Sequence, residues 1–250
     1  MPPLIVQSRF RGPAGSGNGG YVCGRIASYV DDPVTVTLRR PIPLATALAV
    51  ERDREGSARV YHGRTLIAEA SPTAVLPALE IPGPVSTAEA RVATGRAHYF
   101  EDPVFPDCFV CGISRRPGDG LRIFPGQVSG RALWAAAWTP DPSITDARGR
   151  LRPEFVWAAL DCPSGIAAAE AARLGQEAAL LLGRMTARLA APPAAGTECR
   201  VIAWPAGRDG RKLTAGSALL GPDGEILAVA KAVWLAVPRP AQPLPADGAS

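Results

Sequence analysis

In the first third of the chain, the spacing of apolar residues predicts one helix followed by a run of strands. Apolar side chains recur at helical spacing across residues 21–30, and Asn18 stands just before them, where its side chain suits a helix N-cap. From Val34 onward the period changes to two, because apolar and polar residues alternate. Strand-like segments continue over residues 47–52, 57–61 and 65–70.

The second half of the chain repeats this order of elements. Residues 130–138 are strand-like, residues 152–174 are helical in period, and several strand-like segments follow. Pro153 suits a first helical turn, because its missing N–H would be unpaired there in any case. Pro163 removes a bond inside the helix, so we expect the helix to kink or restart at that point.

Individual residues also recur at a fixed offset of 151 positions. Leu38, Pro41, Thr46 and Val50 correspond to Leu189, Pro192, Thr197 and Val201. Four matches in a Pro/Ala-rich chain can arise by chance, but their agreement with the element order favours an internal duplication. Consecutive strands pair as antiparallel hairpins, and a single helix must bury its apolar face against them. The expected fold is α+β, a double hotdog: two repeats of strand, helix and antiparallel strands in one continuous or paired sheet around central helices.

This duplication divides the chain into segments. We expect an N-terminal hotdog repeat over residues 1–83, a Pro/Gly-rich linker over 84–127, a C-terminal repeat over 128–237 and a disordered tail over 238–250. Ser86 and Glu89 form a capping-box pattern, which predicts a short helix over residues 87–94 in the linker. The last strand, residues 225–237, is apolar on both faces except for one lysine, so it should be central in the sheet.

Composition narrows the class of protein. Among 250 residues, 47% are hydrophobic, yet no apolar run approaches the ~20 residues of a membrane span. The first residues do not resemble a signal peptide, and five cysteines, an odd number, argue against a disulfide framework. We therefore expect a cytoplasmic protein that does not bind membranes. The formal charge of +4 includes no basic run interleaved with aromatic residues, so no nucleic-acid partner is expected.

Three motifs carry a family resemblance. They are GSGNGGYVCGRIA at residues 15–27, CFVCGISRRPGDGLRIFPG at 108–126 and WAALDCPSG at 157–165. Together they resemble hotdog-fold acyl-CoA thioesterase-like proteins, in particular an uncharacterised bacterial branch of double hotdogs, and the resemblance covers residues 10–237. In this family a glycine pair opens the central helix. Here the pair follows Asn18 rather than a histidine, so His-dependent chemistry is not expected at this position.

The resemblance implies a site between the two repeats for acyl-CoA or another acyl thioester, with no cofactor. Gly19 and Gly20 would face the thioester carbonyl, because glycines let a ligand approach and free amides at a helix N-terminus stabilise an oxyanion. Asn18 would orient the same carbonyl. The first helix offers Arg25 and no acid along its middle, so the second, pseudo-equivalent site should be degenerate. A homodimer is a further expectation.

Asp161 is the candidate catalytic residue, as general base for water or as direct nucleophile. Trp157 lies one helical turn before it, and such an apolar neighbour raises a carboxyl pKa because burial disfavours the charge. The alternative is that Asp161 merely caps the helix restarting at Pro163. Ser164 and Thr186 are weaker candidates for polar contacts in the cleft, the latter on family geometry alone.

Two further motifs leave alternatives open. Residues 15–20 satisfy G-x-G-x-x-G, but a dinucleotide site needs an acid about 20 residues on. Arg39 and Arg40 occupy that region instead, which leaves an NADP site conceivable. Cys108 and Cys111 form half of a zinc knuckle, which His98 with a distant cysteine, or a second chain, would have to complete. Otherwise they pack a turn, as Cys162 beside Asp161 is expected to pack the helix.

The predicted function is therefore a thioesterase-like hydrolase of acyl thioesters. Two alternatives belong to other classes: a non-catalytic acyl-CoA or lipid-binding hotdog protein, and a zinc-stabilised interaction domain.

Overall fold

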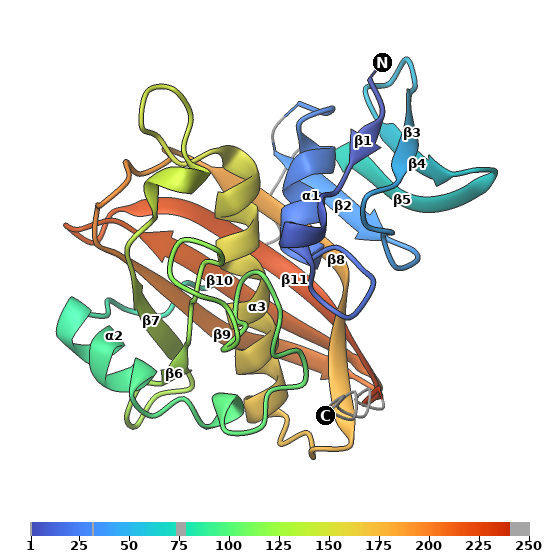
Figure 1. Ribbon diagram of the computed structural model, residues 1–250. Coiled ribbons are helices and arrows are strands. Elements are labelled where there is room, and N and C mark those ends of the chain that lie inside the picture. Colours follow the sequence, from blue (N-terminus) through green and yellow to red (C-terminus); the bar gives the residue numbers. More distant parts are fainter. Residues whose placement is uncertain (1, 32, 74–78, 241–250) are drawn as a thin grey trace, which may run out of the picture.

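A computed structural model describes residues 2–31, 33–73 and 79–240, and in this part of the chain one sheet of eleven strands carries the fold (Figure 1). The strands are β1 (Leu4–Ile5), β2 (Val34–Leu38), β3 (Ala47–Arg52), β4 (Ala58–His62), β5 (Thr65–Pro72), β6 (Gly126–Gln127), β7 (Trp134–Trp138), β8 (Ala178–Leu189), β9 (Cys199–Asp209), β10 (Lys212–Leu220) and β11 (Ile226–Pro238). The helices α1 (Gly19–Ala27) and α3 (Pro153–Ala171) lie on the same face of this sheet, and α2 (Thr87–Thr94) packs against β7.

The strand order has the same pattern in both halves. It runs β1-β3-β4-β5-β2 and then β8-β11-β10-β9-β7-β6, with every neighbouring pair antiparallel. If β1–β5 are counted as the five strands of the first half and β7–β11 as the five strands of the second, both halves have the same order across the sheet. The first strand is followed by the third, the fourth, the fifth and then the second. The halves join where β2 pairs with β8, and there Thr35 lies opposite Thr186, with their hydroxyl oxygens 2.9 Å apart. These two residues are 151 positions apart, the offset found in the sequence.

Local signals at the helix ends are confirmed. The Asn18 side chain caps α1 by accepting a hydrogen bond from the Tyr21 N–H, and Ser86 with Glu89 forms the capping box of α2. The expected restart at Pro163 is wrong, because α3 continues through it as one helix. This helix is buried on nearly all sides between residues 155 and 168, and tertiary packing of this kind outweighs one missing backbone bond.

Helices α1 and α3 approach each other unusually closely at two glycines one turn apart. A Cβ atom added to Gly20 would lie 2.3 Å from the Cβ of Asp161, and one added to Gly24 would lie 2.5 Å from the Cα of Glu154. Only residues without a side chain allow this contact. It brings the middle of α3, and with it Asp161, against the first turn of α1.

The last strand occupies the place its apolar pattern predicts, since β11 lies between β8 and β10 near the middle of the sheet. Just beyond it, Arg239 donates its backbone N–H to the Glu177 carbonyl at 2.7 Å and its guanidinium group to Asp102. The rest of the predicted tail, residues 241–250, lies outside the described residues. No helix in the described ranges is long and apolar enough to cross a membrane.

Candidate active site

A cavity of about 980 Å³ lies beside the junction of the two helices. Its walls come from both halves of the chain and from the linker: the loop before α1, the segment after β2, residues 98–111, the second half of α3 and the start of β8. Asp161 lines it and is 2% exposed. Asn18 and Asp161, which are 143 residues apart in the sequence, both line this one cavity.

Asp161 uses one carboxylate oxygen for structure and leaves the other free. Its Oδ2 accepts hydrogen bonds from the Gly20 N–H and from Asn18 Nδ2, both at 2.9 Å. Its Oδ1 is buried and has no hydrogen-bond partner in the described chain. Burial raises the pKa of Asp161 to about 7, because the desolvation of the carboxylate outweighs the bond from Gly20. A carboxyl group in this state can take up a proton near neutral pH.

Asn18 holds a fixed orientation because both ends of its amide are used. The oxygen must face the Tyr21 N–H, which only donates, so the nitrogen faces Asp161. The residue predicted to orient a substrate carbonyl therefore orients the carboxylate, and it does so as part of the helix cap.

The two glycines that follow have separate roles. Gly20 gives its N–H to Asp161 and does not line the cavity, so the close approach there is between helices and not to a ligand. Gly19 does line the cavity, and its N–H makes no hydrogen bond within the described chain. Of the predicted oxyanion donors, Gly19 is therefore the one whose amide is available.

Three other predicted site residues lie behind the site and do not line the cavity. Ser164 Oγ donates to the Asp161 carbonyl oxygen at 2.7 Å and accepts from Trp234 Nε1 at 3.0 Å. Thr186 pairs with Thr35 across the junction of the halves, and Trp157 is buried in the core. These side chains support the framework around Asp161 instead of offering contacts to a ligand.

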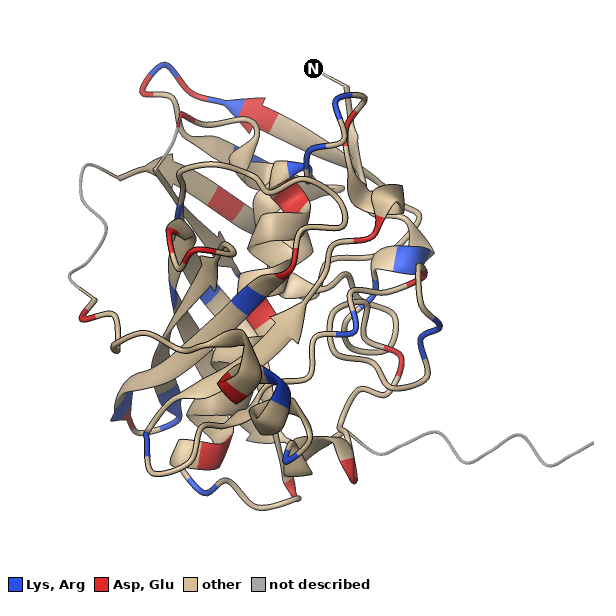
Figure 2. Ribbon diagram, turned by 90° about the vertical axis from the view of Figure 1, so that its left-hand side faces the viewer, with Lys and Arg blue, Asp and Glu red and all other residues tan. Residues whose placement is uncertain are grey.

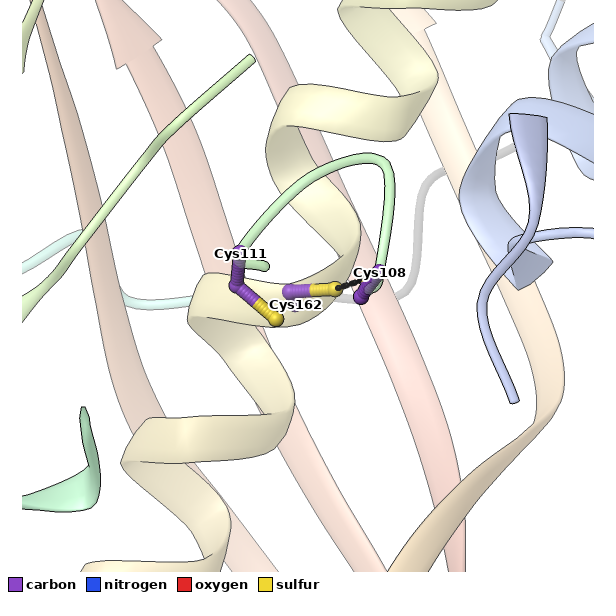
Figure 3. Close-up of side chains that lie close together, drawn as sticks. All are labelled: Cys108, Cys111 and Cys162. Carbon is purple, nitrogen blue, oxygen red and sulfur yellow. Dashed lines mark hydrogen bonds between the residues drawn. The ribbon is translucent and has the colours of Figure 1, made fainter. Parts of the chain in front are cut away.

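The two linker cysteines, Cys108 and Cys111, lie close to a third cysteine, Cys162, which the sequence predicted only to pack the helix. Cys162 projects from α3 toward the loop that carries Cys108 and Cys111, and its sulfur lies 3.6 Å from that of Cys108 (Figure 3). The one sequence feature that could have indicated this role for Cys162 is its position next to Asp161 in the same helix. His98, by contrast, is exposed and bonds Glu101.

The thiols also perturb one another. The pKa of Cys108 is lowered well below its usual range, because the thiols of Cys111 and Cys162 and the backbone amides of Val110 and Cys111 donate to its sulfur.

The dinucleotide alternative is wrong for this chain. The glycine-rich loop leads into α1, and the strands of the described sheet pair only in antiparallel fashion, whereas that motif requires a parallel βαβ unit. Arg39 is paired with Glu69.

In the view of Figure 2, acidic and basic residues are interspersed along the loops and strands.

Comparisons with known proteins place this architecture. No protein-family model and no curated protein matches the sequence. Among solved structures, the tesB protein of Mycobacterium avium subspecies paratuberculosis matches 91% of this chain and 90% of its own chain, with a TM-score of 0.55 at 13% identity. The fold is of the hotdog type.

Some solved structures that match a shorter part of the chain bear thioesterase names. A thioesterase from Haemophilus influenzae matches 51% of this chain and 85% of its own, at 14% identity and a TM-score of 0.44. A thioesterase superfamily protein matches 46% of this chain at 16% identity and a TM-score of 0.41, and the present chain spans 54% of its length. The full-length match with the tesB protein, together with the large antiparallel sheet, confirms the expected α+β hotdog fold.

Proposed function

We propose that this chain is a double hotdog that hydrolyses an acyl thioester in the cavity between its two repeats. The shared strand order of the halves and the pairing of Thr35 with Thr186 support the duplication. The observation that carries the activity is the carboxylate of Asp161, which lines the cavity with one oxygen tied to the first turn of α1 and the other without a partner in the described chain.

Each step of hydrolysis has a group in place. Asp161 accepts a proton from water as the water oxygen attacks the thioester carbonyl carbon. The carbonyl oxygen becomes an oxyanion, and the Gly19 N–H at the positive end of α1 stabilises it. The C–S bond then breaks, and the departing thiolate takes the proton from Asp161. The products are a carboxylic acid and a thiol, and the enzyme returns to its starting state.

Charges at the cavity favour coenzyme A as the carrier. Arg40 and Arg173 line the cavity and are exposed, and their guanidinium groups make no ion pair or hydrogen bond in the described chain. Unpaired arginines suit the phosphates of a nucleotide carrier. An acyl-CoA should therefore have a lower KM than the same acyl group on a short thiol without phosphates.

The test is release of free thiol from a panel of acyl-CoAs by the wild-type protein and by Asp161→Asn. Loss of a general base should lower kcat/KM at least ~100-fold. Asp209→Asn, at an exposed site at the end of β9, is the matched control and should retain full activity. If Asp161→Asn retains turnover, Asp161 is not the general base. Thermal stabilisation by acyl-CoA without any turnover would instead indicate a binding protein.

A further inference from the structure

Three thiols from distant parts of the sequence converge at the wall of the cavity. Cys108 and Cys111 come from the linker and Cys162 from α3, and all three line the cavity. Their sulfur atoms lie within 4.8 Å of one another, and those of Cys108 and Cys162 are 3.6 Å apart (Figure 3). None of the three forms a disulfide.

The linker loop is shaped to present two sulfurs to the same side. The Gly112 N–H closes the turn onto the Cys108 carbonyl at 2.8 Å, and a Cβ at Gly112 would lie 2.4 Å from that oxygen. The turn therefore requires glycine at this position. Backbone bonds from Leu121 and Ile123 to Phe109 and Val110, at 2.8 and 3.0 Å, hold the loop between its cysteines.

We propose that Cys108, Cys111 and Cys162 bind one zinc ion as thiolates. Zinc prefers tetrahedral sulfur ligands at about 2.3 Å, which places neighbouring sulfurs about 3.8 Å apart, close to the 3.6 Å found here. A disulfide needs sulfurs about 2.05 Å apart and would use only two of the three. All three cysteines line the cavity, so the ion would lie at the cavity wall.

The side chain of Asn18 provides a hydrogen-bond donor to the negatively charged thiolates of such a cluster. Asn18 Nδ2 lies 3.8 Å from the sulfur of Cys108 and 3.6 Å from that of Cys162, so beside its bond to Asp161 this amide also donates to the two sulfurs. Donors of this kind around the ligands stabilise and orient bound metal ions.

The ion would join the linker to α3, next to Asp161. This site does not depend on the proposed hydrolysis, because metal binding is measured without any substrate.

The first test uses the wild-type chain, purified under reducing conditions without oxygen. We expect one zinc per chain by elemental analysis. Replacement by Co²⁺ should give thiolate-to-cobalt charge-transfer absorption and the visible bands of a tetrahedral ion. Chelation should lower Tm, and added zinc should restore it. Substoichiometric metal together with no cobalt spectrum would overturn the proposal, as would a disulfide within the cluster as the prevailing form of this preparation.

Variants then assign the ligands. Cys111→Ser and Cys162→Ser should each lose most of the bound metal and the cobalt charge-transfer absorption. Cys199→Ser is the matched control, because this buried cysteine lies in β9, outside the cluster, and its thiol donates to the Thr197 carbonyl oxygen. It should keep the metal. A folded Cys162→Ser protein with unchanged metal content and an unchanged cobalt spectrum would contradict the assignment.

Discussion

Asp161 and Glu170 are two carboxylates on the same helix, and both line the same cavity. They are separated by about 13 Å along α3. Burial raises the pKa of each, and each has one buried oxygen without a partner in the described chain. By burial and pKa alone, either one qualifies as a general base.

The difference lies in the groups around them. Asp161 accepts from the first turn of α1, where the neighbouring Gly19 N–H stays available to an oxyanion. Glu170 accepts from the indole N–H of Trp134, which is thereby used. A raised pKa marks both carboxylates as candidates. The helix N-terminus beside Asp161 is what distinguishes them, because hydrolysis needs an acid–base group and an oxyanion donor together.

Gly20→Ala should break this arrangement with the largest effect. The added methyl would lie 2.3 Å from the Cβ of Asp161 and 2.7 Å from the Trp157 carbonyl oxygen, so α1 and α3 must separate. Overpacking of this kind lowers stability by about 1–3 kcal/mol. Because the shift also moves Gly19 away from Asp161, thiol release should fall at least ~10-fold at temperatures where the variant remains folded.

Gly83→Ala is the control for this change, because an added Cβ there meets only the end of the Arg131 side chain, at 3.8 Å. It should leave Tm and turnover unchanged. A Gly20→Ala protein with wild-type turnover would show that the contact between the helices does not position the site.

Asn18→Ala and Arg152→Ala compare the N-caps of the two helices. Asn18 caps α1 and holds Asp161, whereas Arg152 makes no capping bond and instead lies over the ring of Phe155 at 4.7 Å. Each change should lower stability by about 1 kcal/mol in chemical unfolding. Only Asn18→Ala should also reduce kcat/KM, because it removes a donor from the Asp161 carboxylate. Equal turnover in the two variants would count against that role.

The sequence was sufficient where the signal is local or periodic. The cap at Asn18, the capping box at Ser86 and the two-residue alternation each depend on neighbouring residues, and each is confirmed. The 151-residue offset reappears in the structure, where Thr35 lies opposite Thr186 at the pairing of β2 with β8.

Contacts between distant residues were harder to predict. Pro163 is disfavoured inside a helix, but the burial of α3 on nearly all sides overrides that local preference. The role of Gly20 depends on the approach of a second helix, and the role of Cys162 depends on where the linker folds back onto α3. The residues within a few positions of Gly20 or Cys162 do not indicate which distant segment each of them contacts.

The smallest expected effect concerns the other carboxylate. Glu170→Gln keeps an acceptor for the Trp134 N–H and removes a half-buried charge. The folded state raises the pKa of Glu170 above its ordinary value of 4.5, chiefly by desolvation, so the ionised side chain disfavours folding. At neutral pH the variant should therefore be slightly more stable, with Tm higher on the order of 2 °C. Its thiol release should match the wild type.

The pH dependence gives the sign of this effect. The penalty on wild-type Glu170 is complete above its folded pKa and decreases as pH falls from there toward 4.5. It is lost below 4.5, where the side chain is neutral in both the folded and the unfolded state. The difference in Tm between Glu170→Gln and wild type, measured from pH 8 to pH 4, should stay constant above the folded pKa and shrink as pH falls below it. A difference that grew on acidification would mean that the Glu170 carboxylate stabilises the fold. Loss of turnover in Glu170→Gln would indicate that Glu170, and not Asp161, is the catalytic carboxylate.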